Sequence, residues 1–147
     1  MNLNHTTSRL CLIATLLLAA NSADAVAKPL QYDDVFELEF VSDPQPDAKG
    51  EQIVFVRNWM DKQTDRRRMT LWLSSADGKQ LEPLTDKDIN ASSPRWAPDN
   101  KRLAFIANGQ IHIKWLETGR TSQSGQLQHS PANLSWSPDG KWLAFSM

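Results

Sequence analysis

One segment of this chain recurs forty residues further along. Residues 93–105 return as residues 133–145, and Trp, Pro, Asp, Lys, Leu, Ala and Phe each reappear at an offset of 40. A fixed period of this length indicates stacked copies of one supersecondary unit, none of which buries its apolar face alone. The chain is therefore expected to fold as a repeat protein.

Each copy reads as strands joined by tight turns. Pro98-Asp99-Asn100-Lys101 and Pro138-Asp139-Gly140-Lys141 are turn sequences, because proline presets φ and Asn or Gly accepts the left-handed conformation that follows. The strands after them, over residues 102–107 and 142–147, are apolar on both faces. That pattern predicts burial between two sheets.

The remainder of the repeat supplies two more strands. Asn108-Gly109 lies between isoleucines and predicts a two-residue hairpin turn. A strand over residues 110–116 follows, and after Thr118-Gly119 a weak outer strand is expected near Leu127. Four strands in about forty residues are typical of one blade of a β-propeller. The six Trp, against a single Tyr, are expected to fill the space between stacked sheets.

A degraded copy precedes these two. Residues 47–56 match the turn and second strand, residues 71–79 match the hairpin, and residues 81–84 form the fourth strand, with ten extra residues placed in a loop over 57–69. The fold class predicted is all-β, a partial β-propeller of two four-stranded blades plus the start of a third. The predicted domains are a signal peptide (1–25), a lead-in segment (26–40) and an incomplete propeller (41–147), with repeats at about 41–90, 91–130 and 131–147.

The N-terminus has the features of an export signal. Arg9 precedes an apolar run over residues 10–20, which is shorter than the roughly 20 residues that cross a bilayer as a helix. Ala23-Asp24-Ala25 supplies a small-x-small cleavage pattern. We expect cleavage between Ala25 and Val26, with cleavage after Ala27 as the alternative. The mature protein is expected to be periplasmic or secreted, with no membrane span.

Composition excludes several kinds of site. A formal net charge of −1 provides no basic stripe for phosphates, so no nucleic-acid partner is expected. Cys11 is the only cysteine and lies in the predicted signal segment, which excludes disulfides and cysteine metal sites from the mature chain. The aspartates of the Pro-Asp turns cap those turns locally, and no His/Asp spacing forms a ligand set. Neither a metal nor another cofactor is expected.

The start of the mature chain resembles that of exported serine peptidases of the prolyl oligopeptidase family. The similarity lies in residues 30–36, Val41-Ser42-Asp43-Pro44-Gln45 and residues 47–57, and it is greatest to the acylaminoacyl-peptidase and dipeptidyl-peptidase-like branch. Residues 45–50 depart from the usual Ser-Pro-Asp-Gly-Lys turn. The resemblance implies a propeller that precedes an α/β-hydrolase domain carrying Ser, Asp and His, and a peptide substrate. The Trp-Ser-Pro-Asp-Gly-Lys repeat is shared with TolB-like propellers, which bind partner proteins without catalysis.

No catalytic residues are assigned within this sequence. It contains no Gly-x-Ser-x-Gly nucleophile elbow, and His5, His112 and His129 are interpreted as signal-segment, strand and loop residues. The repeat pattern indicates the front part of a longer protein, so any catalytic domain is expected beyond Met147. These residues alone are expected to be inactive.

One charged cluster is a candidate contact site. Residues 61–68 read Asp-Lys-Gln-Thr-Asp-Arg-Arg-Arg and are placed in a loop of the first blade. Such runs are usually solvated surface. The alternative is that Arg66, Arg67 or Arg68 holds a substrate carboxylate or the catalytic domain, as planar guanidinium groups do well. Asp61 and Asp65 are alternative partners for these arginines.

Overall fold

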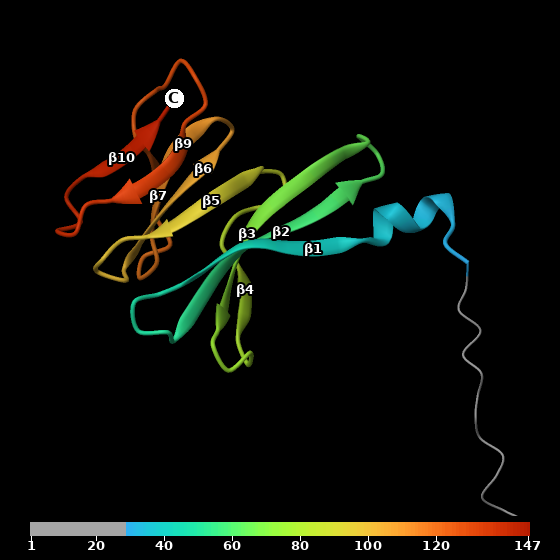
Figure 1. Ribbon diagram of the computed structural model, residues 1–147, viewed down its shortest axis with the longest axis horizontal. Coiled ribbons are helices and arrows are strands. Elements are labelled where there is room, and N and C mark those ends of the chain that lie inside the picture. The colour runs from blue at the N-terminus through green and yellow to red at the C-terminus, as the bar shows by residue number, and fades with distance from the viewer. Residues whose placement is uncertain (1–28) are drawn as a thin grey trace, which may run out of the picture. The chain divides into compact units, whose positions relative to one another are not determined.

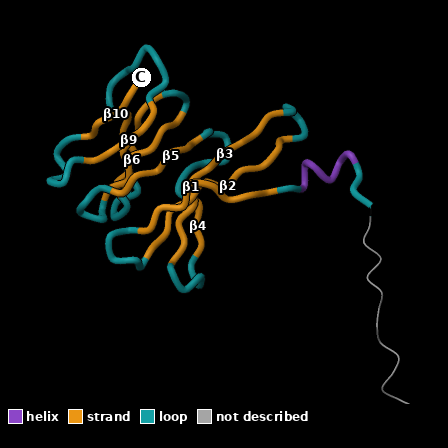
Figure 2. The backbone as a smooth tube through the Cα atoms, in the orientation of Figure 1, coloured by secondary structure: helices purple, strands orange, loops and turns teal. Residues whose placement is uncertain are grey.

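The computed structural model describes residues 29–147 (Figures 1 and 2). The chain divides into two units, residues 1–30 and 31–147, and only Pro29 and Leu30 of the first are described. The predicted signal peptide and its cleavage site between Ala25 and Val26 lie outside the described residues. The second unit contains all the strands given below.

The first sheet is a four-stranded antiparallel blade. A 3-10 helix, η1 (Tyr32–Glu37), leads into strands in the order β1-β2-β3-β4. The strand bounds are β1 (Glu39–Pro46), β2 (Gln52–Asp61), β3 (Arg66–Ser75) and β4 (Leu81–Pro83).

The second sheet repeats this arrangement, and a two-stranded sheet follows it. The second blade has the order β5-β6-β7-β8 and the last sheet pairs β9 with β10, all antiparallel. The predicted all-β partial propeller, with two four-stranded blades and the start of a third, is confirmed. The strand bounds are β5 (Ala91–Trp96), β6 (Arg102–Ala107), β7 (Gln110–Trp115), β8 (Thr121–Gln123), β9 (Ala132–Trp136) and β10 (Leu143–Ser146).

The same turn joins the first two strands of every sheet. The N–H of its fourth residue donates to the carbonyl of its first, at 2.9–3.1 Å. Asp99 and Asp139 then accept the N–H two residues ahead, at 2.9 and 3.1 Å. In the first blade Asp47 supplies the carboxylate from the first turn position and accepts the N–H of Glu51 at 2.8 Å. Residues 45–50, which differ from the usual Ser-Pro-Asp-Gly-Lys sequence, therefore still form the turn, and only the position of the carboxylate in it differs. The three closing pairs are Gly50–Asp47, Asn100–Ala97 and Gly140–Ser137.

Two predictions within the blades were wrong. The extra residues of the first blade do not form a loop over 57–69, because β2 and β3 pair from Gln52↔Ser75 to Asp61↔Arg66 and leave only residues 62–65 between them. The outer strand of the second blade is β8, which starts two residues after Gly119 of the Thr118-Gly119 turn, and not a strand near Leu127. Leu127 instead packs against a small core cluster of Ala104, Ile111 and Leu134, and it is held there because Gln110 accepts its N–H at 2.8 Å and donates to its carbonyl.

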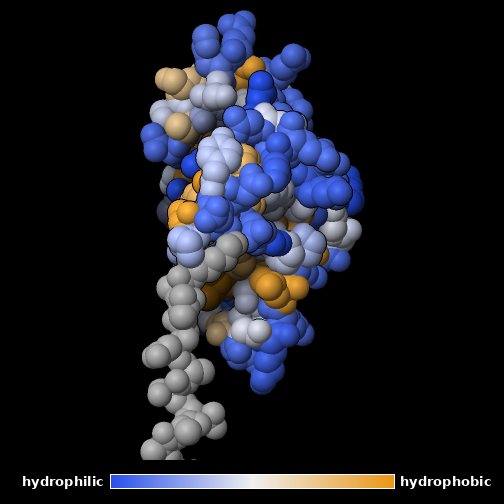
Figure 3. All heavy atoms as spheres, turned by 90° about the vertical axis from the view of Figure 1, so that its right-hand side faces the viewer, coloured by the Kyte–Doolittle hydropathy of each residue, from blue (hydrophilic) through white to orange (hydrophobic). Residues whose placement is uncertain are grey.

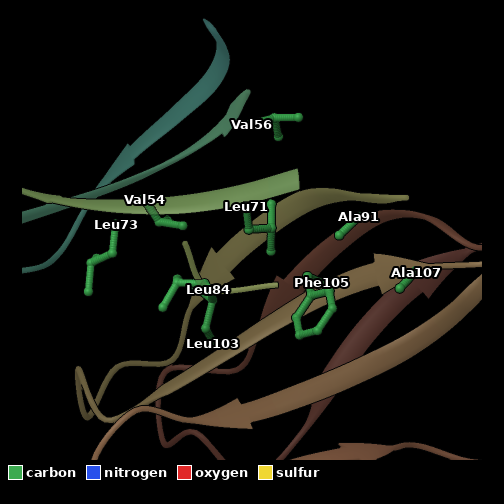
Figure 4. Packing of buried hydrophobic residues seen from close by; sticks show 9 residues of the cluster. All are labelled: Val54, Val56, Leu71, Leu73, Leu84, Ala91, Leu103, Phe105 and Ala107. Atoms are coloured by element: carbon green, nitrogen blue, oxygen red, sulfur yellow. The ribbon is translucent and has the colours of Figure 1, made fainter. Parts of the chain in front are cut away.

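The main core lies between the first two blades (Figure 4). Alternate residues of β2 and β3 face alternate residues of β6, so one face of each sheet meets the other. A smaller cluster of Ala104, Ile111 and Leu134 joins the second blade to the last sheet. Side chains on both faces of β6 are thus buried, as predicted. The same prediction for residues 142–147 was wrong, since three of the four residues of β10 are exposed. The main cluster comprises Val54, Val56, Leu71, Leu73, Leu84, Ala91, Leu103, Phe105 and Ala107.

Two of the tryptophans also hydrogen-bond to the preceding blade. The indole N–H of Trp96 donates to the carbonyl of Gln45 at 2.9 Å, and that of Trp136 donates to the carbonyl of Arg95 at 3.1 Å. Both rings pack on the core clusters between sheets. The expectation that all six fill such gaps was too broad, since the Trp142 residue is 74% exposed.

Candidate functional site

The first strand of each sheet carries a repeated irregularity. β1 contacts β5, and β5 contacts β9, so these first strands lie side by side. Asp43, Ser93 and Asn133 occupy equivalent positions in them and have φ of 47°, 55° and 54°. The pairing register shifts at Asp43 and Ser93, as in β-bulges, which re-aim the side chains beside them.

An ion pair joins the bulge of the first blade to the second blade. Arg95 Nη1 lies 2.9 Å from Asp43 Oδ2 and 3.1 Å from Oδ1, and it also donates to the Pro94 carbonyl at 2.6 Å. Gln45 Nε2 donates to the same carboxylate at 2.8 Å. The two side chains are 32% and 29% exposed, so the pair is accessible to solvent while held in place.

Arg95 lies between two surface hollows. One is at the end of the sheets where β5 and β9 begin, and the other is at the end that carries the Pro-Asp turns. The first is the more polar and offers amide and hydroxyl groups as both donors and acceptors. Its polar lining besides Arg95 is Asn90, Ser92, Ser93, Asn108, Ser130 and Asn133.

The three arginines selected from the sequence lie elsewhere. They occupy the first three positions of β3, opposite Asp61, Met60 and Trp59, and none of them lines the two hollows. Arg68 is held 3.8 Å from Asp61 and 3.8 Å from Asp88, so the predicted pairing with Asp61 does occur. A hydrogen bond from the N–H of Gln63 lowers the pKa of the Asp61 carboxyl below its ordinary value, which keeps the partner of Arg68 ionised.

The first two of these arginines are more exposed. Arg66 and Arg67 are both exposed, and the contact of Arg67 is with the Met69 sulfur, at 3.4 Å from Nη2. Much of the surface in Figure 3 is hydrophilic, with hydrophobic residues gathered in smaller patches. Arg66 and Arg67 are therefore solvent-exposed charges at the end of this hairpin, whose Lys62 pairs with Asp33 of η1 at 3.0 Å.

The two histidines in the described part of the chain lie on a strand and in a loop. His112 lies on β7 and stacks on Phe105, with ring centroids 5.5 Å apart. His129 is exposed in the loop before β9. Among residues 29–147 no group of three or more His, Cys, Asp or Glu side chains is placed to hold a metal ion. No helix within the same residues is long and apolar enough to span a membrane.

Comparison with solved structures identifies the fold. The chain aligns with the acylaminoacyl peptidase of Pyrococcus horikoshii at a TM-score of 0.65 and 19% identity, over 78% of this chain and 18% of that one. It aligns with the β-propeller domain of the trilobed protease from Pyrococcus furiosus at a TM-score of 0.57 and 20% identity, over 74% of this chain and 34% of the other. The chain is part of a β-propeller.

Sequence relatives of this propeller segment are named as peptidases. The uncharacterized peptidase YuxL of Bacillus subtilis is 26% identical over 119 residues, which cover 78% of this chain and 18% of YuxL. A dipeptidyl-peptidase 5 from Porphyromonas endodontalis is 28% identical over 102 residues, or 66% of this chain and 15% of that protein. The predicted resemblance to this group of peptidases is confirmed, although no protein-family model matches the sequence.

The propeller segment also resembles TolB. The Tol-Pal system protein TolB of Pseudomonas entomophila is 38% identical over 64 residues, which cover 41% of this chain. The chain spans less than a fifth of the length of each of these curated relatives. What the whole proteins do is therefore a matter of proposal for this chain.

Proposed function

We propose that this chain is the propeller portion of an exported serine peptidase, in which it limits the peptides that reach a catalytic α/β-hydrolase domain. The observation that carries the proposal is the similarity to YuxL over 78% of the chain, which extends beyond a single repeat. The blades of a propeller surround a central channel, and we propose that this channel admits extended chains and excludes folded ones. No catalytic role is assigned to residues 1–147.

The substrate class follows from the same relatives. Two of them are named as dipeptidyl-peptidase 5, so we propose short peptides as substrates and the catalytic domain as the propeller's principal partner. We also propose export, on the sequence features of residues 1–25, with Val26 as the first mature residue. N-terminal sequencing of the exported protein tests this, and retention of residues 1–25 would contradict both the cleavage site and the localisation.

The complete protein provides the decisive assay. Purified from its full gene, it should hydrolyse chromogenic dipeptidyl or acylaminoacyl substrates and be labelled on a serine by a fluorophosphonate probe. A folded protein that contains the same cleavable sequence should resist, and the same protein should be degraded after unfolding. Equal cleavage of the folded and unfolded forms would contradict the limiting role of the propeller.

A TolB-like binding module is the second candidate. It is favoured by the higher identity to two Pseudomonas TolB proteins, 36–38%, within 63–64 residues. This function predicts no serine labelling and stable capture of a protein partner. The fluorophosphonate probe therefore separates the two candidates in one experiment.

The exposed end of β3 is the proposed contact with the catalytic domain or with a substrate carboxylate. Arg66 and Arg67 are the better candidates, because Arg68 is already held by Asp61 and Asp88. Exchange of both for Glu should weaken hydrolysis, since a charge reversal opposes any acidic partner. The matched control is Lys79→Glu in the turn between β3 and β4, where the lysine is 82% exposed.

A further inference from the structure

We propose that Arg95 is a binding site for a peptide carboxylate on the surface formed by the first strands of the sheets. The carboxylate is that of a peptide's C-terminus or of an acidic side chain. The inference rests on the proposed function in one respect, namely that peptides reach this surface. It depends on neither the Arg66–Arg68 segment nor the position of the catalytic domain.

Within residues 29–147, one nitrogen of the Arg95 guanidinium donates hydrogen bonds and the other two do not. All hydrogen bonds of the Arg95 side chain to residues 29–147 come from Nη1, which donates to Asp43 and to the Pro94 carbonyl. Nε and Nη2 donate to no group in that part of the chain. These two nitrogens form the edge whose parallel N–H bonds match the two oxygens of a carboxylate.

The side chain is held before any ligand arrives. Asp43 fixes Nη1 from the neighbouring blade, and the Arg95 carbonyl accepts the indole N–H of Trp136. Backbone and side chain are thus anchored to the blades on either side. An arginine with restricted rotamers loses less conformational entropy on binding than a free surface arginine.

The surroundings suit a peptide better than a bare anion. Arg95 lines the polar hollow that also contains Ser93 and Asn133, the residues of the repeated bulge. Hydroxyl and amide side chains there offer partners to the N–H and C=O groups next to the bound carboxylate. Asn133 already donates to Ser146 at 3.0 Å, so its carbonyl oxygen is the acceptor available to a peptide N–H.

Asp43 sets the strength of the site. Its negative charge offsets that of the guanidinium, and it lies on the Nη1 side, away from the edge formed by Nε and Nη2. The pair is about one-third exposed, and solvent screens the repulsion between Asp43 and a second carboxylate. The expected binding is therefore weak and specific, which suits a ligand that must dissociate from the site again.

The test uses the complete protein and peptides that differ in one group. The first pair has a free C-terminus or a C-terminal amide, and the second pair has Glu or Gln at one internal position. The wild type should show a KM about tenfold lower for the carboxylate member of at least one pair, with kcat unchanged. The two pairs separate the two sources of the carboxylate.

Two variants assign the effect to the guanidinium edge. Arg95→Gln should abolish the KM difference, and Arg95→Lys should reduce it strongly, because an ammonium keeps the charge and loses the planar fork. Arg120→Gln is the matched control, since Arg120 is exposed on the turn before β8 and lines neither hollow. Melting temperatures of the variants show whether the loss of the Asp43 ion pair has unfolded the blades.

The outcomes separate this inference from the proposed function. Hydrolysis with equal KM for both members of both pairs would overturn the carboxylate site and leave the peptidase proposal intact. If the protein hydrolyses no peptide, the proposed function fails, and fluorescence anisotropy with the same labelled peptides decides the site alone. Binding that prefers the carboxylate and is lost in Arg95→Gln supports it; binding without that preference, or none, refutes it.

Discussion

The indole hydrogen bonds between blades make a prediction that depends on the repeat geometry. Trp96→Phe removes the N–H that donates to the Gln45 carbonyl at 2.9 Å, together with part of a ring packed on the main core cluster. A lost hydrogen bond of this kind costs about 1 kcal/mol. The smaller ring adds about as much again through lost apolar burial. We expect a local destabilisation of about 2 kcal/mol at the junction of the first two blades.

Native-state hydrogen exchange is the suitable assay. Global unfolding of a large protein is rarely two-state, whereas amide protection reports the opening of one region. Protection in β5 and β6 should fall by roughly thirtyfold in Trp96→Phe, because each 1.4 kcal/mol corresponds to a factor of about ten. Trp136→Phe should act in the same way on the junction with β9, since its indole donates to the Arg95 carbonyl at 3.1 Å.

Trp142→Phe is the matched control. The substitution is the same, but the Trp142 residue is 74% exposed in the described part of the chain. Its indole N–H donates to no group within residues 29–147. Protection should change by less than about twofold. Equal losses in Trp96→Phe and Trp142→Phe would refute the argument that the hydrogen bond between blades stabilises the junction.

Three further predictions concern the core, one turn and the isolated segment. Leu71→Ala should destabilise the first blade by about 3 kcal/mol, because Leu71 is fully buried, whereas Leu81→Ala should have little effect at 60% exposure; hydrogen exchange measures both. The Ser75 hydroxyl lowers the pKa of Asp77 below 3.8. This hydrogen bond therefore stabilises the turn at pH values above the ordinary pKa of an aspartate, and its contribution is lost as the pH falls through the lowered pKa. In Ser75→Ala, an NMR titration of the carboxyl group should show a higher pKa for Asp77. A protein of residues 26–147 should lack peptidase activity. It should also self-associate, because β10 pairs only with β9 in the described part of the chain and leaves an edge open to other chains; a monomer with one cooperative melt would contradict this expectation.

Local sequence signals determined the blades because their causes are local. A turn such as Asn108-Gly109 needs two residues with positive φ, and both have it, at 50° and 72°. The apolar pattern of residues 102–107 likewise predicted a strand buried on both faces, as β6 is. Fold class and the order of strands were therefore predictable without tertiary information.

Features that need a partner strand were not predictable. The charged residues 61–68 read as a loop, but Asp61 and Arg66 pair across the hairpin and extend both strands. The outer strand of the second blade depends in the same way on pairing with β7, which selects Thr121–Gln123 over the more apolar residues near Leu127. Edge strands this short carry too little hydrophobic pattern for a sequence to place them.

The candidate site was decided by tertiary structure alone. Asp43 and Arg95 are 52 positions apart and belong to different blades. Asp43 lies in the Ser-Asp-Pro-Gln segment and Arg95 in the forty-residue repeat, and both motifs were recognised in the sequence. These motifs indicate the fold, but they do not indicate that the two side chains form an ion pair. The repeat determines that blades stack, because each has an apolar face to bury. Which side chains then meet is fixed by the bulges and by the stacking itself, and within residues 29–147 that arrangement leaves Nε and Nη2 of Arg95 without an acceptor.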